Sequence, residues 1–73
     1  DATEMERAAD LLNNIRTRMG ITIVWVEHIM GVLMRIVDRV IVLDHGEKIF
    51  EGAPAQAALD PRVTEVYLGK KKA

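Results

Sequence analysis

The stretch Ile21–Gly52, ITIVWVEHIMGVLMRIVDRVIVLDHGEKIFEG, contains the patterns that decide the fold. It holds two apolar runs rich in β-branched residues: Ile21–Val26, which ends at Glu27 and His28, and Val40–Leu43, which ends at a polar turn. Unbroken apolar runs of this length are typical of strands buried on both faces of a parallel sheet. The residues between the runs are enough for a short crossover helix. We therefore expect two parallel, neighbouring strands joined by a helix.

Capping residues mark several helices around this unit. Thr3 and Glu6 fit a capping box that opens a long amphipathic helix, and Gly20 is placed for the left-handed residue that ends it. Near the C-terminal end, Asp60 precedes Pro61, a pair typical of a helix start. The expected helices are about 3–19, 29–37, 54–59 and 61–68.

The polar turn after the second apolar run predicts a hairpin. Asp44–Glu47 contains Gly46, which can adopt positive φ and so allows a tight reversal. Residues 48–51 are then expected to return as a short antiparallel strand. The predicted fold class is thus α/β, with two parallel strands plus a short antiparallel strand, covered by about four helices.

Composition excludes several classes of protein. With 73 residues the chain makes at most one small domain, and with 49% hydrophobic residues it is globular and not disordered. A net charge of −1 gives no basic footprint for nucleic acid, so no nucleic-acid partner is expected. Because there is no cysteine, disulfides and thiolate metal sites are excluded, and we expect no metal site. No apolar run approaches the ~20 residues of a membrane span.

A series of short motifs carries a resemblance to a known family. The motifs are Val26-Glu27-His28, Met30, Asp38–Leu43, Gly46–Ile49, Glu51–Pro54 and Tyr67–Gly69. Each is weak evidence alone, but together they span nearly the whole chain in the family's order and spacing. The chain resembles the C-terminal part of the ATP-binding subunit of an ABC transporter. More narrowly, it is similar to the ATPases of branched-chain amino acid importers.

The resemblance implies a partial P-loop NTPase-type fold in which residues 1–73 form a single fragment of a nucleotide-binding domain. The family's phosphate loop, glutamine loop, signature motif and Walker B strand are not found among these residues. The implied parent hydrolyses ATP with Mg and works with a second ATP-binding subunit and transmembrane permease subunits. It is peripheral, on the cytoplasmic face of the membrane. The fragment alone is expected to be inactive and to hold no cofactor, and the transported solute stays open.

His28 is the one catalytic and nucleotide-binding residue that the resemblance implies, as the switch histidine. Phosphoryl transfer is catalysed chiefly by positioning and by stabilising charge on the γ-phosphate oxygens, and an imidazole held at a strand end can donate to one of them. Glu27 beside it is interpreted as structural or solvent-facing, and His45 as an exposed turn residue. Many family members carry Asp or Asn after the histidine to cap the next helix, whereas Ile29 occupies that position here.

An alternative from another class is a stand-alone small α/β module that serves binding or oligomerisation without nucleotide. An upstream reading frame encoding G-x-x-x-x-G-K-[ST] would decide between the two. If the family's neighbouring strands are missing, Ile21–Val26 has unpaired edges, and exposed edges promote association. We therefore also expect the fragment to favour a homodimer.

Overall fold

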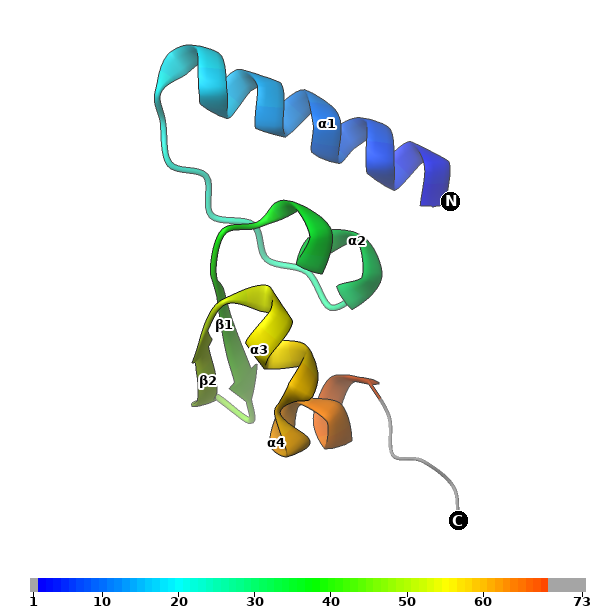
Figure 1. Ribbon diagram of the computed structural model, residues 1–73, viewed down its shortest axis with the longest axis vertical. Coiled ribbons are helices and arrows are strands. Elements are labelled where there is room, and N and C mark those ends of the chain that lie inside the picture. Colours follow the sequence, from blue (N-terminus) through cyan, green and yellow to red (C-terminus); the bar gives the residue numbers. More distant parts are fainter. Residues whose placement is uncertain (1, 69–73) are drawn as a thin grey trace. The chain divides into compact units, whose positions relative to one another are not determined.

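The computed structural model describes residues 2–68 and divides into two compact units, Asp1–Ile36 and Val37–Ala73 (Figure 1). The first unit contains two helices joined by an extended segment. The second contains a two-stranded sheet followed by short helices. The mixed helix and strand content agrees with the expected α/β class, although the sheet differs from the expected one.

In the first unit, helix α1 spans Ala2–Met19 and ends as predicted at Gly20. Gly20 has a φ of 63°, and its N–H donates to the carbonyl of Arg16 at 2.9 Å, which satisfies a carbonyl of the last helical turn. The predicted capping box is wrong, because Thr3 is the second residue of the helix and cannot be its N-cap. The residue before the helix, Asp1, lies outside the described residues.

Helix α2, Met30–Ile36, confirms the predicted second helix and packs against α1. Ala9 of α1 is fully buried and Leu33 of α2 is 8% exposed, so these two side chains form the centre of a small core. Glu6, expected in the capping box, instead accepts a hydrogen bond from Arg35 at 2.6 Å. This pair is largely exposed and is worth only about 0.2–1 kcal/mol, so apolar contact holds the two helices together.

The predicted strand Ile21–Val26 is wrong. The segment between α1 and α2 carries no strand, and the side chains of Val24 and Val26 are 86% and 90% exposed. A strand exists only when its backbone N–H and C=O groups pair with a neighbour, and the sheet found in residues 2–68 pairs two other segments. The predicted parallel pairing of Ile21–Val26 with Val40–Leu43 is therefore also wrong.

In the second unit, strands β1 (Val40–Asp44) and β2 (Glu47–Gly52) form the predicted antiparallel hairpin. The turn residues His45 and Gly46 have φ angles of 52° and 77°, as a tight hairpin turn with both central residues left-handed requires. The register shifts after Val42, whose partner is Phe50, because the next residue, Leu43, pairs with Lys48. This irregularity bends the strand pair locally.

Helices α3 (Pro54–Leu59) and α4 (Pro61–Val63) follow the hairpin, and the chain continues into the π-helix η1 (Thr64–Leu68). The predicted cap is confirmed, because Asp60 Oδ1 accepts from the backbone N–H groups of Arg62 at 2.8 Å and Val63 at 3.1 Å. The predicted end of this helix at Gly69 lies outside the described residues. The core of this unit consists of Val40, Val42, Ala57 and Val63.

Candidate functional site

The candidate site is the turn that leads into α2, where His28 lies. Its side chain is 84% exposed, and the chain bends at this residue before the helix begins at Met30. The expected setting at the end of a strand is not found. The imidazole lies beside Glu27, just ahead of the helix, and not at the edge of a sheet.

Glu27 organises this turn. Its Oε1 accepts the backbone N–H of His28 at 2.8 Å and that of Ile29 at 3.3 Å. These N–H groups lie just ahead of α2, which begins at Met30, so the two bonds fix the turn that leads into the helix. Ile29, the residue before the helix, has no polar side chain to accept from the N–H groups of its first turn. The sequence interpretation of Glu27 as structural is consistent with this geometry, but the sequence did not predict which groups it would bind.

The same carboxylate oxygen also lies 3.3 Å from Nδ1 of His28. The pKa of Glu27 is lowered, first by the hydrogen bond from the N–H of His28, then by that from Ile29, with a smaller contribution from the charge of His28. Glu27 is only 21% exposed, whereas His28 projects into solvent. The arrangement therefore combines an anchored carboxylate with an accessible imidazole, a group that can donate a hydrogen bond to an anionic oxygen.

These residues can supply one contact to a nucleotide phosphate but not a complete site. Residues 2–68 contain no group of three or more His, Cys, Asp or Glu side chains that could hold a metal ion. The sequence also contains no G-x-x-x-x-G-K-[ST] loop whose backbone N–H groups could surround phosphates. Among residues 2–68, His28 offers an exposed imidazole with the chemistry for such a contact.

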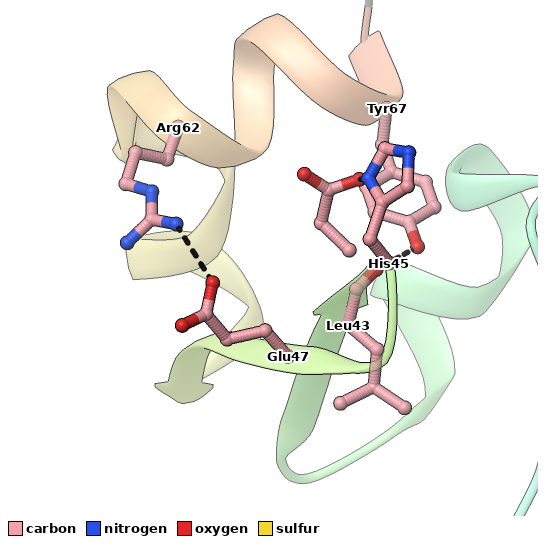
Figure 2. A network of polar contacts seen from close by, with 6 residues as sticks. Leu43, His45, Glu47, Arg62 and Tyr67 are labelled. Carbon is pink, nitrogen blue, oxygen red and sulfur yellow. Dashed lines mark hydrogen bonds and ion pairs between the residues drawn. The ribbon is translucent and has the colours of Figure 1, made fainter.

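A second polar network lies at the hairpin of the other unit (Figure 2). His45, 94% exposed as expected, has its Nδ1 2.9 Å from Oδ1 of Asp44. Tyr67 in η1 donates its hydroxyl hydrogen to the carbonyl of Leu43, which ties η1 to β1 (Figure 2). No sequence signal predicts this bond, because donor and acceptor lie 24 residues apart. We interpret this network as structural, since it fixes the helices on the hairpin.

None of the helices within residues 2–68 has the length and apolar character needed to cross a bilayer.

Comparison with known proteins finds relatives over most of this chain. The chain is 39% identical over 61 residues to the methionine import ATP-binding protein MetN of Caulobacter vibrioides, which is 84% of this chain and 18% of the relative. It is 44% identical over 60 residues to MetN of Rhodospirillum rubrum, covering 80% of this chain and 17% of the relative. The high-affinity branched-chain amino acid transport ATP-binding protein BraF of Pseudomonas aeruginosa is 32% identical over 60 residues, 82% of this chain and 24% of the relative.

The chain thus spans about a fifth of the length of the curated relatives that it matches. The two methionine import proteins are more similar to this chain, at 39% and 44% identity, than BraF is at 32%. The comparison therefore does not favour branched-chain importers over methionine importers. No family model matches the chain. No solved structure matches it either.

Proposed function

Because this chain is related to the ATP-binding subunits of ABC importers over more than four fifths of its length, we propose that it is the part of such a subunit that contributes a switch histidine, His28. The single observation that carries the proposal is an accessible imidazole at the start of a helix, within a sequence related to ATP-binding import proteins. The subunit would hydrolyse ATP to drive import of an amino acid.

His28 acts by charge stabilisation and positioning. Water attacks the γ-phosphorus, the bond to the β-phosphate oxygen breaks, and the proton of the water ends on the inorganic phosphate or the solvent. His28 donates a hydrogen bond to a γ-phosphate oxygen and so stabilises the charge that this oxygen carries in the transition state. Mg, when bound with the nucleotide, neutralises charge on the phosphate oxygens, and its ligands would come from residues beyond these 73.

The proposed setting is a P-loop NTPase-type domain on the cytoplasmic face of a membrane. The partners would be a second ATP-binding subunit and transmembrane permease subunits. The relatives' names support an amino acid as the transported solute, since they refer to methionine and to branched-chain amino acids. The permease and any binding protein would choose among these solutes, so His28 and its neighbours need not differ between them.

The test is His28→Ala in the intact subunit, with His45→Ala as the matched control. A charge-assisted hydrogen bond that matters mainly in the transition state predicts a fall in kcat of about ten- to a hundredfold. The dissociation constant for ATP should change by less than about threefold, because ground-state contacts are mostly elsewhere. His45→Ala, which removes an exposed imidazole from the hairpin turn, should leave kcat within about twofold of wild type.

Thermal melting of both variants checks the fold, since the φ of 52° at His45 disfavours alanine there. A His28→Ala subunit that hydrolyses ATP at the wild-type rate would rule out the assigned role. An equal loss of kcat in both variants would also rule it out, because the effect would not belong to this histidine.

A further inference from the structure

We infer that Glu27 is a positioning residue for His28: its carboxylate holds the backbone of the histidine and of the next residue, and thereby sets the direction of the imidazole. The inference rests on the proposed role of His28 and adds a second residue to the same site. Nothing in the relatives' names or in the motif series assigns Glu27 a function.

The geometry carries this assignment. One oxygen, Oε1 of Glu27, receives the N–H of His28 at 2.8 Å and the N–H of Ile29 at 3.3 Å, and lies 3.3 Å from the ring atom Nδ1 of His28. The N–H bonds restrict the backbone on both sides of the Cα of His28. The ring contact lies on the Nδ1 side, and with the side chain 84% exposed it leaves the ring free to meet a ligand through Nε2.

The local sequence explains why a carboxylate is needed here. Helix α2 has only seven residues, and Gly31 in its first turn lowers its intrinsic stability. Ile29, the residue before the helix, has no side-chain acceptor for the N–H groups of the first turn. Glu27 instead accepts the two N–H groups just ahead of the helix, which would otherwise turn to water. The carboxylate therefore fixes the backbone that leads into α2.

The same contacts argue against Glu27 as a general base. An oxygen that accepts backbone hydrogen bonds is stabilised as the anion, and the pKa of Glu27 is lowered accordingly. A lowered pKa makes a carboxylate a poorer proton acceptor near neutral pH. The two roles predict different behaviour for an amide. The Oε1 of a glutamine can accept the same N–H bonds, but an amide cannot take up a proton.

The experiment measures kcat and KM for ATP in the intact subunit with Glu27→Ala, Glu27→Gln and the double variant Glu27→Ala/His28→Ala. Glu27→Ala should lower kcat about five- to tenfold, the factor that corresponds to losing about one hydrogen bond, with KM changed less than about twofold. Glu27→Gln should restore kcat to within about twofold of wild type. Glu47→Ala, which removes an exposed glutamate whose ion-pair partner is Arg62, is the matched control and should behave as wild type.

The double variant separates positioning from an independent structural effect. If Glu27 acts through His28, adding Glu27→Ala to His28→Ala should lower kcat by less than about twofold further. A full additional five- to tenfold loss would overturn the inference, as would a Glu27→Gln enzyme as slow as Glu27→Ala. Wild-type kcat in Glu27→Ala would overturn it too. The proposed function fails on a different result, wild-type kcat in His28→Ala alone, so the two failures are distinguishable.

Discussion

Two apolar runs of similar composition have different structures in this chain. Val40–Asp44 forms strand β1 with Val40 and Val42 buried, whereas Ile21–Val26 belongs to no strand and is exposed at Val24 and Val26. The difference lies in the partner. β1 reaches β2 through a two-residue turn, so closing the pair costs little chain entropy. Ile21–Val26 has no second strand-forming segment that a short turn could bring alongside it.

An apolar β-branched run therefore forms a strand only where a partner strand is present. Its backbone N–H and C=O groups must pair, and only a neighbouring strand can satisfy them in regular order. For β1 the partner strand follows directly after the turn, so any chain that contains the turn and both flanking segments can form the pair. A strand whose partner lies far away in the sequence can form only in a chain that also contains that distant segment. The predictions below test this contrast, beginning with the largest expected effect.

The largest effect should separate Val42→Asp from Val26→Asp, the same substitution in the two runs. Val42 is 4% exposed, and a carboxylate there would be buried without a partner, which predicts a loss of about 3 kcal/mol or more in the free energy of unfolding. Val26 is 90% exposed, so Val26→Asp should change the free energy of unfolding by less than about 0.5 kcal/mol. Urea unfolding of the 73-residue chain, followed by circular dichroism, measures both.

An equally large loss in Val26→Asp would break the comparison, because Val26 would then be buried in solution. Light scattering on the wild-type chain would give the reason. A dimer that Val26→Asp dissociates would mean that a second copy covers the apolar run, in line with the expected homodimer. A wild-type monomer with the same large loss would mean that the segment packs within its own chain.

The accuracy of the sequence predictions largely follows the same division. Several ends of elements marked by local chemistry were predicted correctly, such as Gly20 after α1, Gly46 in the turn and the Asp60 cap, whereas the Thr3–Glu6 capping box was not. In each case the decisive groups lie within four residues of one another. The absence of a strand at Ile21–Val26 could not be predicted from the residues of that segment, since strand formation depends on a neighbour. The bond from Tyr67 to Leu43 was missed for the same reason.

The candidate site divides in a similar way. The sequence placed His28 between a strand and a helix that starts at about Ile29, and the structure confirms the helix, which begins at Met30. The predicted supporting strand was wrong, and the backbone at His28 is bound by Glu27 and not by a sheet. A glutamate next to a histidine has many conformations open to it in a sequence. Its hydrogen bonds to His28 and Ile29 become visible only once the turn is built.

A smaller pair of effects, of opposite sign, should distinguish the hairpin from α2. Gly46 has a φ of 77°, so Gly46→Ala forces a residue with a Cβ into the left-handed region at a cost of about 1–2 kcal/mol. Gly31 lies inside α2 with nothing within 4 Å of an added Cβ, so Gly31→Ala should stabilise by about 0.5–1 kcal/mol. Amide hydrogen exchange measures the first effect in β1 and the second in α2, because each substitution lies in a different compact unit. Faster exchange of α2 in Gly31→Ala would contradict the helical placement of Gly31.

The smallest effect concerns two glutamates whose pKa is lowered for different reasons. In Glu27 the leading cause is the backbone N–H of His28, and in Glu51 it is the hydrogen bond from Lys48, with Nζ 2.7 Å from Oε1. Both folded-state pKa values lie below the ordinary value of 4.5. Each carboxylate therefore contributes stability above that pH, and the contribution is lost as the pH falls through the lowered pKa. Both groups are in contact with solvent, so the effect on unfolding is small and is better followed at the groups themselves.

Salt should separate these two causes. Raising NaCl from about 0.05 M to about 1 M shortens the screening length to about 3 Å and weakens the attraction between Lys48 and Glu51. The pKa of Glu51 should then rise toward 4.5, whereas that of Glu27 should move less, because uncharged backbone donors hold it. NMR titration of the carboxyl carbons at both salt concentrations measures this, and Lys48→Met is the control that should raise only the pKa of Glu51. If the pKa of Glu27 followed that of Glu51 in high salt, its anchor would be a charge and not the helix start. The positioning of His28 by Glu27 would then lose its structural basis.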